Sequence, residues 1–168
     1  VEAVGGEAGY LYGGEIGQQE NRAFVNRFGI DLEHFEGSPN LEDFDLIALV
    51  DHIPSGDAVA LDRIDILIDH DEHPETVEPA FSDVRPNISS TSTILTKYLQ
   101  EFDLTPSEVI ATALLYGIRS ETVDFKRETT PADLTAAAYL YPFADHDTLE
   151  QVESPSMSPE TLDILAEA

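Results

Sequence analysis

The chain has 168 residues, of which 42% are hydrophobic, so it is long enough and apolar enough to bury the core of one domain. It carries 34 Asp and Glu against 8 Lys and Arg, a formal net charge of −26. It contains no cysteine, which excludes disulfides, thiolate metal sites and cysteine nucleophiles. No apolar run approaches the ~20 residues of a membrane span and no signal peptide is visible, so we expect a cytoplasmic protein without a membrane partner.

The acidic residues are spread along the whole chain among apolar residues and are not gathered in a tail. Self-repulsion of this size weakens a fold, but at molar salt the Debye length falls to about 3 Å and the repulsion is screened. We interpret the acidity as adaptation to a salt-rich, halophilic cytoplasm. The alternative interpretation is an acidic surface that binds a basic partner.

The first half of the chain alternates short strands with helical or connective segments. Apolar runs and turn residues define these segments. In chain order, the predictions are a strand near 10–12, a helix over 18–27 that ends before Gly29, a polar connection over 32–43, a strand over 44–50, a loop over 52–60, a strand over 64–68 and an edge strand over 77–84.

The second half is predicted to be helical. Hydroxyl residues over 89–93 are potential N-caps, and Thr105 and Thr130 each precede a proline and an acidic residue, which is typical of a helix start. The predicted helices cover about 94–102, 109–116 with a stop at Gly117, 130–143, 145–152 and 158–168. The pattern predicts an α/β fold, a parallel sheet flanked by helices, with a helical C-terminal part.

Two predicted neighbouring strands end in polar, potentially metal-binding residues. The strand over 44–50 is followed by Asp51, and the strand over 64–68 by Asp69, His70 and Asp71, with His73 close behind. In open α/β sheets ligands bind outside the carboxyl ends of the strands. Carboxylates with an imidazole suit a hard divalent ion such as Mn²⁺ or Mg²⁺. The simpler explanation is a solvated strand end and an acidic loop in a protein that is acidic everywhere.

Two later segments could contribute to the same site. Ser90 and Thr91 lie at a predicted helix start, where free backbone N–H groups and the helix dipole can hold a phosphate. Plain helix capping is the alternative there. Arg119 and Glu121 follow a buried helix and could serve as a phosphate ligand and a metal ligand.

The order of these segments resembles the DHH-family phosphoesterases, especially the branch that degrades short oligonucleotides and related nucleotides. The similarity covers nearly the whole chain. It lies in Leu49-Val50-Asp51-His52, Ile68-Asp69-His70-Asp71, the helix start over 90–99, and Gly117-Ile118-Arg119-Ser120-Glu121-Thr122, preceded by the segments 14–16 and 19–24.

The resemblance implies a two-metal hydrolase, usually Mn²⁺-dependent, in which water held between the ions attacks phosphorus in line. Asp51 would bridge the ions, His70 would bind one of them, and Glu121 takes the place of a late metal-binding Asp. The resulting assignment is Asp69 and Asp71 as catalytic residues, Asp51, His70 and Glu121 as metal ligands, and Ser90, Thr91 and Arg119 as substrate-binding residues.

The chain also departs from the family pattern. Asp71 stands where the family has a second His, and Glu121 is one methylene longer than the expected Asp. The family's first-strand motif, His-x-x-x-Asp-x-Asp, does not occur before Asp51. We therefore expect residues 1–168 to be a single DHH-type domain that lacks its first metal-binding motif and the C-terminal substrate domain.

The leading functional hypothesis is metal-dependent hydrolysis of phosphoester bonds in short oligonucleotides or nucleotides, with little activity expected from this stretch alone. The alternative is a catalytically degenerate module that senses a nucleotide or regulates an attached domain. A third reading is a plain acidic interaction domain, which would bind no metal. The expected partners are a nucleotide or short oligonucleotide and, in a homodimer, a second copy of the chain.

Overall fold

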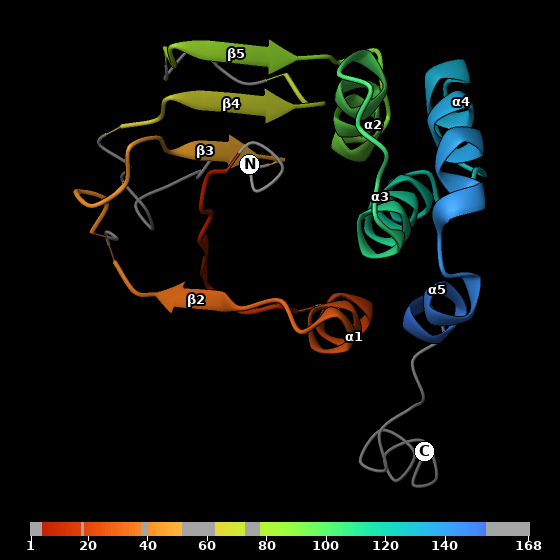
Figure 1. Cartoon of the computed structure of the whole chain (residues 1–168), viewed down its shortest axis with the longest axis horizontal. Helices are drawn as coiled ribbons and strands as arrows, with labels where there is room; N and C mark the ends of the chain where they lie inside the picture. The colour runs from red at the N-terminus through yellow and green to blue at the C-terminus, as the bar shows by residue number, and fades with distance from the viewer. Residues whose placement is uncertain (1–4, 18, 38–39, 52–62, 73–77, 154–168) are drawn as a thin grey trace, which may run out of the picture.

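The computed structural model describes residues 5–17, 19–37, 40–51, 63–72 and 78–153. Figure 1 shows the strands β3, β4 and β5 on one side and the helices α2, α3 and α4 beyond their arrowheads. The elements, in chain order, are β1 (Tyr10–Gly13), α1 (Gln19–Phe28), β2 (Leu32–Phe35), β3 (Ala48–Val50), β4 (Ile66–Asp69), β5 (Phe81–Val84), α2 (Thr91–Glu101), α3 (Glu108–Glu121), α4 (Pro131–Leu140), the 3₁₀ turn η2 (Tyr141–Phe143) and α5 (His146–Glu153).

All strand pairs in the described part of the chain are parallel. β1 pairs with β2, and β3, β4 and β5 form a separate sheet in chain order. In that sheet Val50 lies opposite Ile68, and Asp69 lies opposite Val84. Asp51 continues the β3–β4 ladder for one more residue, because its N–H donates to the carbonyl of Ile68 at 3.0 Å. The carboxyl ends of β3 and β4 are therefore held side by side.

The helices of the C-terminal part pack on one another and form the main hydrophobic core. Its fully buried members come from α3, α4 and α5 and include Leu115, Ile118, Leu140 and Leu149. The starts of these helices are fixed by side-chain caps, as local sequence requires. At α4, Thr130 and Asp133 form a reciprocal capping box with a proline in the first turn.

The structure confirms the α/β class, the parallel pairing and the helical C-terminal part. One predicted connection is wrong, because Leu32–Phe35 forms β2, with Leu32 and Phe35 half-buried while the two residues between them are exposed. The strand predicted over 44–50 is shorter than expected, since only Ala48–Val50 pairs in a ladder as β3. The loop over 52–60, His73, the start of the 77–84 strand and the helix over 158–168 lie outside the described residues.

Two predicted boundaries of α3 are also wrong. Thr105 is not its cap, because the side chain of Ser107 accepts the hydrogen bond from the N–H of Ile110. Gly117 does not end the helix, which continues to Glu121. A Cβ at Gly117 would overlap the Oγ of Ser92 and lie 3.1 Å from its Cβ. This glycine therefore serves the close approach of α2 and α3 and not a helix stop.

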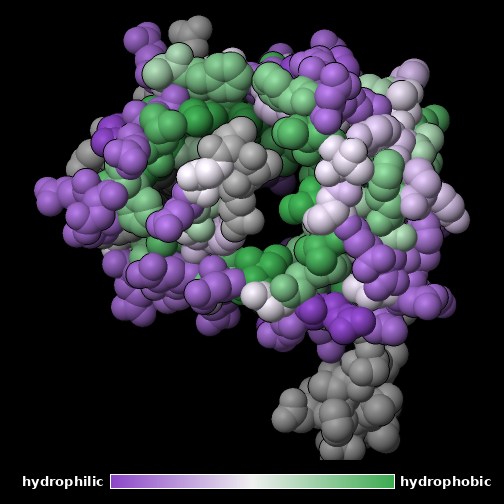
Figure 2. Space-filling view, viewed as in Figure 1, coloured by the Kyte–Doolittle hydropathy of each residue, from purple (hydrophilic) through white to green (hydrophobic). Residues whose placement is uncertain are grey.

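An apolar cleft of about 1040 Å³ separates the β1–β2 pair from β3. Figure 2 shows hydrophobic residues around the hollow between these elements. The exposed side chains of Tyr10, Phe44, Leu46 and Val50 contribute to its lining, and β3 is an edge strand of its sheet here. Among the described residues, no helix has both the length and the apolar character needed to cross a membrane.

Candidate functional site

Asp51 leaves the end of β3 in an unusual backbone conformation. Its φ is 60°, in the left-handed region that a non-glycine residue seldom adopts. Its carboxylate is held by the hydroxyl of Thr91, which donates to Oδ1 at 2.6 Å. The same oxygen lies 3.5 Å from Nε2 of His70. Such local strain persists where the surrounding structure fixes it, and it occurs often at functional sites.

Asp69 shapes the turn after β4. Its side chain is buried, and its Oδ1 accepts hydrogen bonds from the N–H groups of His70 at 2.6 Å and Asp71 at 3.0 Å. These bonds fix the backbone that carries both following side chains. As a result, one ligand atom from each of Asp51, Asp69 and His70 lies within 4.8 Å of the others.

Glu121, the last residue of α3, reaches the same place from the helical layer. Partial burial raises the pKa of its carboxyl, and the negative charges of Asp51 and Asp71 raise it further. His70 and Arg127 act in the opposite direction on this pKa. Glu121 lines the same pocket as Asp51 and Asp71, and these carboxylates repel one another without a cation between them.

These residues surround a polar pocket of about 650 Å³, a size that suits a small ligand. The lining combines the ends of β3 and β4, the turn before α2, and the segment that follows α3. Its residues are Asp51, His70, Asp71, Pro86, Asn87, Ile88, Ser89, Glu121, Arg127, Glu128 and Thr130.

The donor set fits a hard divalent cation. It offers carboxylate oxygens and an imidazole nitrogen, which suit Mn²⁺ or Mg²⁺. Ligand atoms about 2.1 Å from one ion lie at most about 4.2 Å apart. One ligand atom from each of Asp51, Asp69 and His70 lies within 4.8 Å of the others, which is close to the spacing that a single ion requires.

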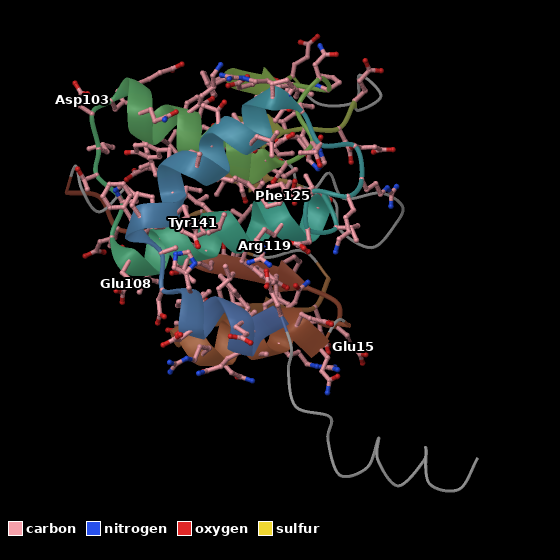
Figure 3. All side chains as sticks on the ribbon, turned by 90° about the vertical axis from the view of Figure 1, so that its right-hand side faces the viewer. Glu15, Asp103, Glu108, Arg119, Phe125 and Tyr141 are labelled. Carbon is pink, nitrogen blue, oxygen red and sulfur yellow. The ribbon has the colours of Figure 1, made fainter. Side chains whose placement is uncertain are left out.

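The residues assigned to substrate binding lie outside the pocket lining. Ser90 is buried and caps α2 by accepting from the N–H of Ser92 at 3.2 Å, while Thr91 is buried and holds Asp51. Arg119 pairs with Asp124 and with Glu153 of α5, each at 3.0 Å. Figure 3 shows Arg119 between α3 and α5. None of the three lines the pocket.

Sequence reasoning missed several residues that do line it, among them Asn87, Arg127 and Glu128. Ser89, the first of the hydroxyl residues over 89–93, also lines it. One signal was available: the adjacent Lys126 and Arg127 form a basic pair in a chain that has only 8 Lys and Arg. The turn residues Pro86 and Asn87, a few residues before α2, were another.

No protein-family model matches the chain. A curated relative, an uncharacterized protein of Methanocaldococcus jannaschii, is 42% identical over 169 residues. The alignment covers 100% of this chain and 35% of that protein, so the chain spans about a third of the relative's length.

Two solved structures are similar across 88% of the chain. One is a candidate family II inorganic pyrophosphatase of Methanococcus jannaschii, with 22% identity, a TM-score of 0.59 and 49% of that protein covered. The other is an exopolyphosphatase-related protein of Bacteroides fragilis, with 15% identity, a TM-score of 0.61 and 54% covered. The chain shares the fold of these two proteins. It spans about half the length of each.

Proposed function

We propose that this chain provides a divalent-metal site for the hydrolysis of phosphoester bonds, with nucleotides or short oligonucleotides as substrates. The observation that carries the proposal is the meeting of Asp51, His70 and Glu121, from three separate elements, at one pocket beyond the carboxyl edge of a parallel sheet. The fold shared with a pyrophosphatase-like and an exopolyphosphatase-related protein supports it, as does the motif resemblance to DHH-family phosphoesterases.

Each side chain has a distinct part in this proposal. Asp51, His70 and Glu121 would hold Mn²⁺ or Mg²⁺, and Asp69 would orient the turn that presents His70. A bound divalent cation would supply a more acidic water and neutralise phosphate charge. Asp71 is exposed in the pocket, where its carboxylate could accept the proton of an attacking water.

Asp71 also supports a second candidate function, a site that binds a phosphorylated ligand without hydrolysing it. This residue lines the pocket. It stands at the sequence position where the DHH family has a second His. A carboxylate cannot give a phosphate the positive partner that an imidazolium gives. This candidate predicts metal and nucleotide binding with no product formed.

Titration calorimetry with Mn²⁺ in molar KCl tests the metal site. We expect saturable binding to the wild-type chain and a loss of at least tenfold in affinity in Asp51→Asn, His70→Ala and Glu121→Gln, since each removes one ligand. Glu150→Gln is the matched control, because Glu150 is an exposed acid of α5 outside the pocket. Equal binding by all variants would show diffuse cation attraction and overturn the proposal.

Product analysis then separates hydrolysis from binding alone. The wild-type chain, loaded with Mn²⁺, is incubated with short oligonucleotides and with nucleotides, and the products are resolved by chromatography. Metal-dependent product that is lost in Asp51→Asn supports the hydrolase. The same assay on a version extended N-terminally by the native gene decides the remaining case, because little activity is expected from this stretch alone: nucleotide binding without product in both versions supports the second candidate.

A further inference from the structure

We infer that Arg127 forms an anion subsite in this pocket and binds a phosphate group whose other oxygens face a divalent cation held by the pocket carboxylates. The inference rests on the proposed function and adds the feature that recognises the substrate. It also assigns the phosphate contact to a residue other than Arg119, which the sequence pattern had favoured.

Arg127 is the one Lys or Arg that lines the pocket within the described part of the chain. Its side chain is 68% exposed, and its ion pair with Glu128 is long, at 4.0 Å. An exposed ion pair of that length contributes little, so the guanidinium can leave it for a stronger partner.

The other paired cations of the described chain are already engaged. Arg85 makes two 2.7 Å hydrogen bonds to Asp83, and Lys126 lies 3.3 Å from Asp124. Arg119 pairs with both Asp124 and Glu153 at 3.0 Å. Arg127 therefore differs from these cations in two ways: it lines the pocket, and its ion pair is longer.

A strained turn brings Arg127 to the pocket. Val123, Asp124 and Phe125 have φ angles of 48°, 55° and 61°, so three successive non-glycine residues are left-handed. For a β-branched residue such as Val123 this is a genuine outlier. Figure 3 shows Phe125 in this turn at the end of α3. The turn reverses the chain, so that Arg127 and Glu121 line the same pocket.

Hydrogen bonds stabilise the turn on both sides of Arg127. The buried hydroxyl of Thr122 donates to the carbonyl of Ile118 at 2.7 Å and accepts from the N–H of Phe125 at 3.1 Å. The carbonyl of Thr122 accepts from the N–H of Arg127 at 2.9 Å. On the other side, the hydroxyl of Ser89 donates to the carbonyl of Glu128.

The chemistry of the pocket narrows the ligand class. Its carboxylates, Asp51, Asp71, Glu121 and Glu128, disfavour a bare anion, so a phosphate must enter together with a divalent cation. The planar guanidinium offers paired N–H donors that match two oxygens of one phosphate. The expected ligand is therefore a metal-complexed phosphate ester or inorganic phosphate.

Two titrations on the same proteins test this inference: Mg²⁺ alone, then inorganic phosphate at saturating Mg²⁺, both in molar KCl. We expect Arg127→Gln to bind Mg²⁺ as the wild type does and to bind phosphate roughly tenfold more weakly, the size of one charge-assisted contact. Arg127→Lys should retain part of the affinity. Lys126→Gln is the matched control, because Lys126 is the adjacent exposed cation outside the pocket lining.

The two titrations separate the possible failures. If the wild type binds no Mg²⁺, the proposed function fails, and this inference fails with it. If Mg²⁺ binds but phosphate affinity is the same in Arg127→Gln and the wild type, or is lost in Arg119→Gln instead, only the Arg127 inference is overturned. Urea unfolding of each variant confirms that the proteins compared are folded.

Discussion

Asp133 is a fully buried carboxylate that joins two helices of the core. Its Oδ1 accepts from the hydroxyl of Thr93 at 2.6 Å, and its Oδ2 accepts from the N–H and the hydroxyl of Thr130 at 2.8 and 2.6 Å. Burial alone would raise its pKa, but the hydrogen bonds outweigh burial and hold the pKa below the ordinary value of 3.8.

This residue should make the fold acid-sensitive. A carboxyl with a lowered folded-state pKa stabilises the protein fully above its unfolded pKa of 3.8, and the stabilisation is lost as pH falls through the lower folded value. We expect Asp133→Asn to lower the free energy of unfolding at pH 7 by about 1–3 kcal/mol, since it weakens buried hydrogen bonds. Urea unfolding between pH 7 and pH 2 measures this.

The dependence of unfolding free energy on pH, compared between the wild type and the variant, provides the control for this prediction. The variant should show a flatter loss of stability below pH 3.8 than the wild type, because it lacks the titrating group. Glu150→Gln, at an exposed position of α5 beyond its first turn, should leave the free energy of unfolding at pH 7 nearly unchanged. Parallel curves for the wild type and Asp133→Asn would contradict the prediction.

At the scale of single residues, the sequence predicts which pocket residues follow the strands. It predicts only some of the pocket residues that come from the helical part of the chain. Asp51 and His70 follow apolar runs, and parallel strands place such ends together by geometry. Glu121 was predicted as a metal ligand from the motif resemblance. Arg127 could not be predicted, because its position depends on three left-handed residues that no local pattern of non-glycine residues indicates.

At the scale of the elements, the crossing of α2 and α3 depends on Gly117. A methyl group there would overlap the hydroxyl of Ser92. We expect Gly117→Ala to destabilise the protein by a net value of up to about 2 kcal/mol, since overpacking costs about 1–3 kcal/mol and the gain in helix propensity returns about 1 kcal/mol. Urea unfolding measures the change.

A double variant tests that cause. Ser92→Ala removes the hydroxyl but keeps the Cβ that lies 3.1 Å from the added methyl, so Gly117→Ala should cost less in that background. Equal costs in both backgrounds would show that the crossing of the two helices does not depend on this contact.

The errors in element boundaries have a common physical reason. A glycine in a helical pattern indicates either a stop or a close helix contact, and only the tertiary packing decides between them. β2 was missed for a similar reason. Its polar central residues, Glu33 and His34, are exposed, and its pairing with β1 is decided by residues about twenty positions away.

At the scale of the whole molecule, the sequence pattern predicted the α/β class but not the division of the strands into two sheets. Parallel order follows from alternating strands and connections. The cleft between the β1–β2 pair and β3 depends instead on which strand edges meet, and strand composition does not encode that choice.

The charge of the molecule leads to the last prediction. With 34 acids and 8 Lys and Arg, most carboxylates have no cationic partner available, so their mutual repulsion opposes folding. Raising KCl from dilute buffer to 1 M shortens the Debye length to about 3 Å, which screens exposed charges more than buried pairs. We expect the Tm to climb steeply over this range in thermal unfolding.

A variant with Glu33, Glu101 and Glu150 changed to Gln should start from a higher Tm in dilute buffer and gain less from salt, because exposed charges are removed while the core is unchanged. A Tm that stays flat from dilute buffer to 1 M KCl would show that the repulsion does not limit stability, and it would favour an acidic surface that serves a basic partner.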